Sequence, residues 1–290
     1  MEAHAQRARR IFEAALEGVR PDYLLDRFPL QAVSDQPLSG YGSVYVVGGG
    51  KAALVMGGAL EEKLGDHLTE GLLTVPHGYS DTIPDWARLP ERIEVVEAGH
   101  PLPDEAGVSA AGRMLELCDR AGENDLVLTL VSGGGSALLP QFADDISLED
   151  ARRLQEALIR SGATIHEINT VRKHCSLLKG GQLARRAGPA RLRALVLSDV
   201  VGNDLSVIAS GPTVPDSTTF ADAIQVLRSH ALWEQLPDSV RSHLQQGREG
   251  EVAETCSEED PTFDRTDTAI LGSNRDALKA ARKQALEYGY

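Results

Sequence analysis

Aromatic residues are scarce in this sequence, which also has few cysteines. Phe, Trp and Tyr make up 4% of the 290 residues, so the core must be packed from aliphatic side chains, as is usual in parallel sheets covered by helices. The three cysteines, Cys118, Cys175 and Cys256, lie far apart and form no CxxC pair. That spacing indicates neither a disulfide framework nor a zinc site, and it fits a reducing cytoplasm.

Long apolar runs are missing as well. No segment approaches the roughly 18 consecutive apolar residues typical of a membrane-spanning helix. Residues 1–10 lack the apolar core of a secretory signal. We therefore expect a soluble, unprocessed, cytoplasmic protein with no membrane contact.

Positive charge is in short supply: 29 Lys and Arg residues stand against 43 Asp and Glu residues, a formal net charge of −14. Nucleic acid and anionic membranes would be repelled by such a chain, so neither is an expected partner. Acidic residues are frequent in residues 247–267, where apolar periodicity is weak. We interpret that run as a solvated acidic loop or hinge.

What the sequence does contain is a regular alternation of strand and helix patterns. Strands are predicted at residues 43–47, 72–75, 93–96, 125–131, 195–197 and 268–271. Helices are predicted at residues 5–19, 54–64, 105–118 and 274–287, after the caps Ser147 and Asp216–Phe220, and from Ile165 to a stop at Lys179-Gly180-Gly181. This order predicts an α/β fold with a mostly parallel sheet and right-handed crossovers.

The first strand runs into Gly48-Gly49-Gly50-Lys51-Ala52-Ala53, a turn that can be tested against two nucleotide-binding motifs. A P-loop would need Gly at Tyr45 and Ser or Thr at Ala52, so that motif is absent. The GxGxxA spacing fits a dinucleotide fold, but the next strand ends at Pro76 without the required acidic residue. Two interpretations remain: an anion site of backbone N–H groups and Lys51, or a tight turn with a solvated lysine.

A second glycine run, Ser132-Gly133-Gly134-Gly135-Ser136, follows the strand of residues 125–131. Consecutive glycines lose much backbone entropy on folding, which a simple connector would not require. We interpret this run as a cradle of N–H groups and two hydroxyls for an anion. His100, in the loop after residues 93–96, can be either a site residue or a structural loop residue.

The helix that begins at Ile165 carries two adjacent cations, Arg172 and Lys173. Cations beside a helix bind phosphate or carboxylate oxygens. The alternative is that both cations pair with Glu167 and other surface acids.

Two carboxylates, Asp199 and Asp204, follow the apolar strand of residues 195–197. Carboxylates at a strand end can hold Mg²⁺ or accept a proton. The glycine turn at Lys51, the glycine run at Ser132 and these aspartates all follow predicted strands. Because ligands in parallel sheets lie outside the carboxyl ends of the strands, we expect these residues to meet at one edge of the sheet.

Five motifs in this order resemble the glycerate 2-kinase family, some members of which carry the name hydroxypyruvate reductase. They are Gly48-Gly49-Gly50-Lys51-Ala52-Ala53, Gly99-His100-Pro101-x-Pro103-Asp104, Ser132 to Leu139, Asn169-Thr170-Val171-Arg172-Lys173-His174-x-Ser176-x-x-Lys179-Gly180-Gly181 and Ser198-Asp199-Val200-x-Gly202-x-Asp204. The resemblance implies ATP- and Mg²⁺-dependent phosphorylation of D-glycerate to 2-phosphoglycerate in a cleft between two α/β domains.

The resemblance also implies roles for individual residues. Catalytic roles fall to Lys51, Arg172 and Asp199. Substrate binding falls to Ser132, Gly133, Gly134, Gly135, Ser136, Asn169 and Lys173. Nucleotide binding falls to Gly49, Gly50, Lys179 and Ser210, and Mg²⁺ binding to Asp204. The chain departs from the family pattern at Asn203, where members usually carry Asp, and family chains continue beyond the equivalent of Tyr290 into a second domain.

The expected organisation is a three-layer Rossmann-like domain at residues 1–246, the acidic loop or hinge at 247–267, and the start of a second α/β domain at 268–290. The helix of residues 5–19 can pack on that second domain, and residues 268–290 should dock on the main body or pair with another copy. We expect impaired kinase activity from this chain alone.

Two other functions stay open at this stage. The first is an NAD(P)H-dependent hydroxypyruvate reductase, which the missing acidic residue after residues 72–75 argues against. The second is a non-catalytic fragment that binds only a small anion. A homodimer is compatible with the sequence.

Overall fold

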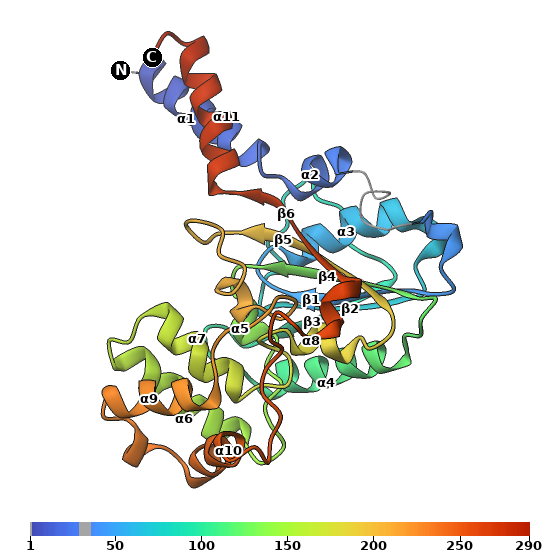
Figure 1. Ribbon diagram of the computed structural model, residues 1–290. Coiled ribbons are helices and arrows are strands. Elements are labelled where there is room, and N and C mark those ends of the chain that lie inside the picture. The colour runs from blue at the N-terminus through green and yellow to red at the C-terminus, as the bar shows by residue number, and fades with distance from the viewer. Residues whose placement is uncertain (1, 29–35) are drawn as a thin grey trace.

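The computed structural model describes residues 2–28 and 36–290, and its centre is one six-stranded sheet (Figure 1). The strands are β1 (Val44–Gly49), β2 (Glu70–Pro76), β3 (Ile93–Ala98), β4 (Leu126–Ser132), β5 (Arg191–Ser198) and β6 (Thr266–Ser273). They lie in the order β3-β2-β1-β4-β5-β6, and every neighbouring pair is parallel. The predicted α/β fold with a parallel sheet is confirmed.

Helices cover both faces of this sheet, so the domain has three layers. Alternate residues of β1 show why: Val44 and Val46 pack with helices α2 (Pro21–Arg27) and α3 (Ala53–Leu64), whereas Tyr45 and Val47 pack with α4 (Glu105–Arg120) and α8 (Gln182–Arg186). Every residue of β1 and β4 is buried, as expected for central strands covered on two sides.

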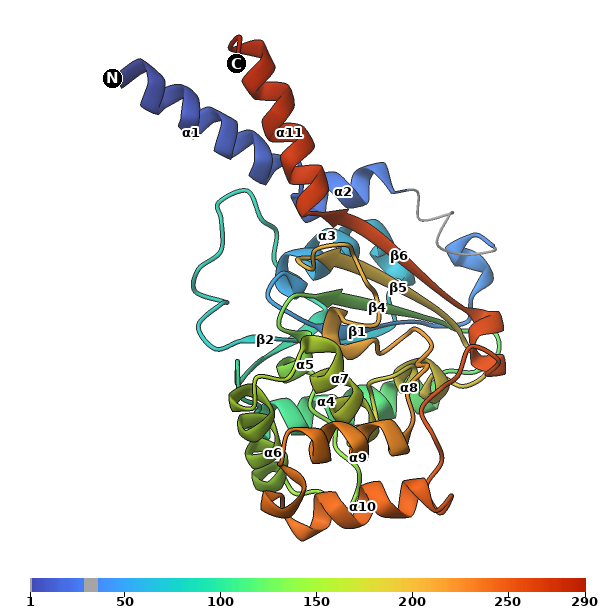
Figure 2. The same cartoon turned by 60° about the vertical axis from the view of Figure 1, so that its left-hand side comes forward.

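A separate group of helices packs beyond the sheet around its own apolar core (Figure 2). It consists of α6 (Leu148–Arg160), α7 (Ile165–His174), α9 (Phe220–Ser229) and α10 (Asp238–Arg248). Side chains fix the starts of three of them, because Ser147, Thr164 and Thr219 each accept a hydrogen bond from a backbone N–H in the first turn. The short helices are α5 (Gly135–Leu138) and the 3₁₀ turns η2 (Leu38–Gly40), η3 (Gly65–His67), η4 (Ile208–Ser210), η5 (Trp233–Gln235) and η6 (Pro261–Arg265).

The helices nearest the two ends of the chain, α1 (Glu2–Glu17) and α11 (Asn274–Glu287), project together from the sheet as a helical arm (Figures 1 and 2). Their contact is close, since a Cβ on Gly18 would lie 2.6 Å from Cβ of Ala280. Residues 268–290 thus dock on the main body, with β6 paired to β5. The boundary of a second domain stays a prediction.

Two predicted boundaries differ from the structure. The strand expected at residues 195–197 begins at Arg191, because Arg191 and Arg193 bind Asp267 on β6 and so occupy strand positions that look polar in the sequence. The helix expected to stop at Lys179-Gly180-Gly181 ends at His174. Gly181 instead precedes α8 with a φ of 79°.

The first helix ends before Pro21, as predicted, but this proline also starts α2, where its missing N–H costs nothing. All three cysteines are free and buried. Within residues 2–28 and 36–290, no helix has both the length and the apolar character needed to cross a membrane.

Candidate active site

A cavity of about 260 Å³ opens at the carboxyl ends of β1, β4, β5 and β6. Its lining is Val19, Lys51, Ala52, Ser132, Gly133, Leu197, Ser198, Asp199, Ser273 and Asn274. Four of these were predicted as site residues from three different strand ends: Lys51, Ser132, Gly133 and Asp199. Sheet topology therefore brings them together, and we call this space the large cavity.

Hydrogen bonds lock the loops after β1 and β4 against each other at the floor of the large cavity. Lys51 N–H donates to the Gly133 carbonyl over 2.8 Å, and Ala52 N–H donates to Ser132 Oγ over 3.0 Å. The loops approach so closely that a Cβ on Gly50 would lie 2.2 Å from Ser132 Oγ. Gly50 is thus required for loop packing, and the buried Ser132 hydroxyl already has a backbone partner.

Asp199 presents an exposed carboxylate to the large cavity. Its backbone carbonyl accepts a hydrogen bond from Asn274 Nδ2 over 3.3 Å, which ties the loop after β5 to the first turn of α11. In the described part of the chain, no hydrogen bond or ion pair holds the carboxylate itself. Asp199 can therefore accept a proton or a cation from a ligand.

A second, small cavity of about 20 Å³ lies at Ser136, the last residue of the glycine run. Its lining is Pro103, Ser136, Phe142, Ala151, Leu154, Gln155, Arg172, Cys175 and Lys179. Arg172 and Ser136 were expected to surround one cleft with Lys51 and Asp199. In this structure they line two different cavities, and the common cleft stays a prediction.

A chain of hydrogen bonds positions Ser136 at the small cavity. Ser210 Oγ donates to Asn169 Oδ1 over 2.9 Å, and Asn169 Nδ2 donates to the Val207 carbonyl over 3.3 Å. Ser136 Oγ lies 2.9 Å from Ser210 Oγ, and because Ser210 has already donated its single proton, Ser136 is the donor in that bond. Three predicted site residues thus form one network.

The small cavity brings two cations together without an acidic partner. Lys179 is buried, and its Nζ donates to the Leu139 carbonyl over 3.0 Å. Burial, with a further contribution from the charge of Arg172, lowers the pKa of Lys179 to about 7. Burial also lowers the pKa of Arg172, whose Nε is buried and has no hydrogen-bond partner among the described residues.

Backbone strain is concentrated beside this network, in η4. Ala209 and Ser210 have φ values of 51° and 61°, a region that residues with a Cβ rarely adopt and that is found preferentially at functional sites. The N–H groups of Gly180 and Gly181 hold the segment in place by donating to the carbonyls of Ser210 and Gly211 over 3.1 and 2.8 Å. Neither Gly nor Asn occurs within η4, so its residue types do not predict this strain.

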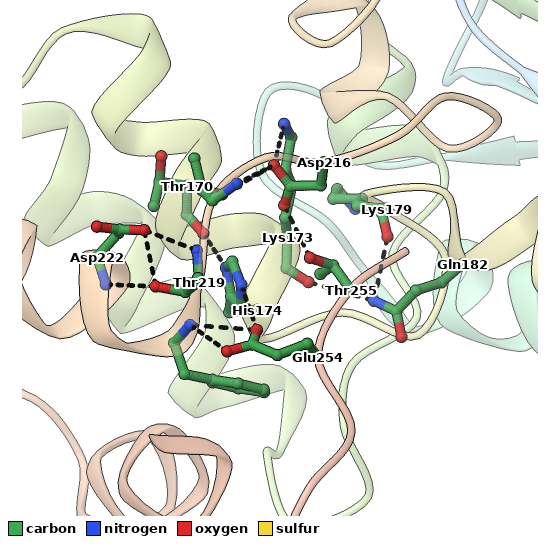
Figure 3. Close-up of polar contacts among 12 residues, drawn as sticks. Thr170, Lys173, His174, Lys179, Gln182, Asp216, Thr219, Asp222, Glu254 and Thr255 are labelled. Atoms are coloured by element: carbon green, nitrogen blue, oxygen red, sulfur yellow. Dashed lines mark hydrogen bonds and ion pairs between the residues drawn. The ribbon is translucent and has the colours of Figure 1, made fainter. Parts of the chain in front are cut away.

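Lys173 faces away from both cavities, into a buried ion pair with Asp216 (Figure 3). Nζ lies 3.1 Å from Asp216 Oδ1, and the two side chains are 7% and 1% exposed. Thr255 Oγ1 donates to the other carboxylate oxygen over 3.0 Å. This contact gives Lys173 a structural partner, so its predicted substrate-binding role would require that pair to open.

The same network reaches residues 247–267, most of which are exposed or half-buried. Thr255 and Cys256 are buried, and Glu254 accepts hydrogen bonds from the Phe220 N–H over 3.1 Å and pairs with His174 Nε2 over 3.1 Å (Figure 3). The acidic segment is therefore attached to α7 and α9 at its centre. This attachment could not be predicted from the sequence, because only a few residues of the acidic segment are buried.

Asp204, the predicted Mg²⁺ ligand, is exposed and stands outside the lining of both cavities. Ser206 donates from N–H and Oγ to Asp204 Oδ1 over 2.9 and 2.7 Å. These bonds, with the charges of His166 and Lys173, lower the pKa of Asp204 despite partial burial. No cluster of three or more His, Cys, Asp or Glu suited to a metal occurs among the described residues.

His100 lies beside the glycine run, since a Cβ on Gly134 would be 3.2 Å from its ring. Burial, and secondly the charge of Lys51, lowers the pKa of His100. Both effects favour the neutral form of its ring. Of the predicted nucleotide-binding glycines, Gly49 instead packs on β2, where a Cβ would meet Thr74 Oγ1 at 2.2 Å.

Sequence reasoning missed the wall of the large cavity formed by Val19, Ser273 and Asn274. These residues lie where α1 and α11 meet the sheet. The strand pattern at residues 268–271 was recognised, but it was assigned to a second domain. A signal did exist, because Ser273 and Asn274 follow a strand just as Ser132 and Ser198 do.

Comparison with known proteins identifies the family of this chain. The family model described as "Domain of unknown function (DUF4147)" matches residues 7–245. This chain belongs to the DUF4147 family. The resemblance to glycerate 2-kinases is confirmed by the relatives of this DUF4147 chain.

A glycerate 2-kinase of Pyrococcus horikoshii is 43% identical over 249 residues, covering 86% of this chain and 54% of that protein. A glycerate kinase of Danio rerio is 39% identical over 296 residues, covering 98% of this chain and 59% of that protein. The crystal structure of a glycerate kinase from Thermotoga maritima matches with a TM-score of 0.82 at 37% identity, covering 100% of this chain and 64% of that one. The DUF4147 chain thus spans little more than half the length of the curated relatives it matches.

Proposed function

We propose that this chain belongs to an enzyme that transfers a phosphoryl group from ATP to the 2-hydroxyl of D-glycerate, giving 2-phosphoglycerate. The observation that carries the proposal is the large cavity, where Lys51, Ser132, Gly133 and Asp199 meet at the ends of neighbouring strands. The names of the relatives supply the substrate class.

Asp199 has the position and the freedom to orient the reacting hydroxyl. Its carboxylate is exposed to the large cavity and has no partner in the described residues, so it can accept the hydroxyl proton as the phosphoryl group arrives. Lys51 lines the same cavity and brings a positive charge. In our proposal it offsets the charge that develops on the transferring phosphoryl oxygens.

Mg²⁺, when bound with ATP, neutralises charge on the phosphate oxygens. One carboxylate oxygen of Asp204 is available to such an ion. Oδ1 accepts both hydrogen bonds from Ser206, which leaves Oδ2 for a cation. Mg²⁺ is usually held by one or two carboxylates together with water and phosphate oxygens, so a larger acidic cluster is not needed.

Coupled assays test the proposal. ATP consumption should require both D-glycerate and Mg²⁺, and NADH with hydroxypyruvate should give no oxidation. The assay should be run on this chain and on a chimera extended with the C-terminal part of the Pyrococcus horikoshii relative, because we expect low turnover from this chain alone. The proposal fails if the chimera ignores ATP, and it is replaced by the reductase if the chimera oxidises NADH.

A further inference from the structure

The small cavity joins the buried Lys179 and the half-buried Arg172, and no carboxylate lines it. Lys179 is 4% exposed, and of its three N–H donors the Leu139 carbonyl takes one. Arg172 makes no hydrogen bond or ion pair within residues 2–28 and 36–290, and its Nε is fully buried. Two neighbouring cations therefore direct unused donors toward the same small space.

Such an arrangement is costly for the empty protein. Buried charges lose their hydration, and like charges repel. Buried cations that serve only the structure therefore normally have an acidic partner. Lys173, six residues before Lys179, has that partner in Asp216. The contrast between these lysines indicates that the missing partner of Lys179 and Arg172 is an anionic ligand.

The size of the cavity limits the kind of anion. A space of about 20 Å³ accommodates roughly one water-sized group, since a single water needs about 10–15 Å³ on the same measure. The space takes one oxygen, so the rest of the anion lies outside the cavity. A carboxylate leaves one further oxygen in need of a partner there, whereas a phosphate leaves three.

We propose that the small cavity binds one oxygen of a small carboxylate between Arg172 and Lys179. The inference rests on the proposed function only for naming D-glycerate as a carboxylate to test. In this proposal phosphoryl groups bind in the large cavity, where Lys51 and Asp199 lie. The glycine run would thus divide two anion sites of different shape.

Binding at this site should be coupled to uptake of a proton. The titratable residues in the described lining are Arg172, Cys175 and Lys179. Burial raises the pKa of Cys175 to about 12, so its thiol is neutral, while Lys179, with a pKa of about 7, is largely neutral above that pH. A bound carboxylate favours the charged ammonium, so above pH 7 Lys179 gains a proton as the anion enters.

Isothermal titration calorimetry with D-glycerate in Hepes and Tris, whose ionisation heats differ, tests this coupling. At pH 8 we expect an uptake close to one proton per bound anion, and at pH 6 close to none. Affinity should fall about tenfold for each pH unit above 7. Binding that exchanges no protons between pH 6 and 9 would overturn the inference.

Variants and competing anions test whether D-glycerate binds at the small cavity. Lys179→Met should weaken D-glycerate binding at least tenfold and abolish proton uptake, whereas Lys283→Met on the arm should bind like the wild type. Acetate should compete with D-glycerate, and inorganic phosphate should not. Unchanged binding by Lys179→Met, or competition by phosphate alone, would refute the carboxylate site. Proton-coupled binding without ATP turnover in the chimera would instead reject the proposed kinase and keep this site.

Discussion

Gly133 lies directly against Asp199: a Cβ on Gly133 would stand 2.0 Å from Oδ2 and 2.6 Å from Cγ of that aspartate. Real side-chain contacts never come so close, so the Asp199 carboxylate can hold its position only because residue 133 has no side chain. The glycine run after β4 therefore makes room for the loop after β5, in addition to any role in binding a ligand.

The first prediction follows from this contact. Gly133→Ala should push the Asp199 carboxylate out of place and lower kcat for D-glycerate phosphorylation in the chimera about a hundredfold or more, the usual worth of a positioned base. Gly112→Ala is the matched control, since its Cβ meets only Gln141 Oε1 at 3.7 Å within α4. Equal turnover of the two variants, measured by coupled ATP consumption, would contradict the role given to Asp199.

A second prediction separates the two aspartates. Asp204→Asn should raise the Mg²⁺ concentration needed for half-maximal activity and leave kcat at saturating Mg²⁺ nearly unchanged. Asp199→Asn should lower kcat at every Mg²⁺ concentration, because the proton acceptor is lost. Mg²⁺ activation curves of both variants in the chimera distinguish the roles, and identical curve shapes would argue against a metal role for Asp204.

The buried pair of Lys173 and Asp216 gives a stability prediction. Lys173→Met leaves an uncompensated carboxylate in the interior and should lower the free energy of unfolding by about 3–5 kcal/mol. The double variant Lys173→Met/Asp216→Leu should recover part of that loss. Urea unfolding of both variants provides the measurement, and a double variant less stable than either single one would show that the pair is not the cause.

Lys179 should give the stability of the protein an unusual pH dependence. Its pKa is about 7 when folded against 10.5 as the ordinary value, so between these values the unfolded chain binds more protons. Unfolding free energy should therefore rise as pH increases from 7 toward 10.5, and the penalty of the buried charge should be complete below pH 7.

Lys179→Met tests this pH dependence. The variant should show a flatter stability profile than the wild type between pH 7 and 9, and a gain in stability at pH 6, in urea unfolding without added anions. Lys63→Met, at a lysine whose surface partner is Asp26, controls for loss of a charge. Parallel profiles for wild type and Lys179→Met would exclude the buried ammonium as the source.

The sequence predicted well those residues whose place depends on topology. Lys51, Ser132 and Asp199 follow apolar strands, and parallel pairing brings such positions to one edge whatever the details of packing. Strand β5 was predicted too short because Arg191 and Arg193 look polar, although Asp267 across the sheet pairs with both.

The sequence could not show which of Arg172 and Lys173 faces the small cavity. Adjacent residues on a helix point about 100° apart, so one enters the small cavity and the other meets Asp216. Which is which depends on where α7 packs, and Asp216 lies 43 residues further along the chain. The strained segment around Ser210 was also hidden, because its positive φ values are imposed by contacts with Gly180 and Gly181 rather than by local residue choice.

The edge position of β6 has a consequence for synthesis on the ribosome. Domains begin to fold as their N-terminal parts emerge, and strands β1 to β5 with the small cavity are complete in sequence before residue 266. Ser273 and Asn274, which wall the large cavity, emerge later and reach it only when β6 pairs with β5. If both proposed sites exist, a nascent chain acquires the carboxylate site before the phosphoryl site, and binds a small acid before it can phosphorylate one.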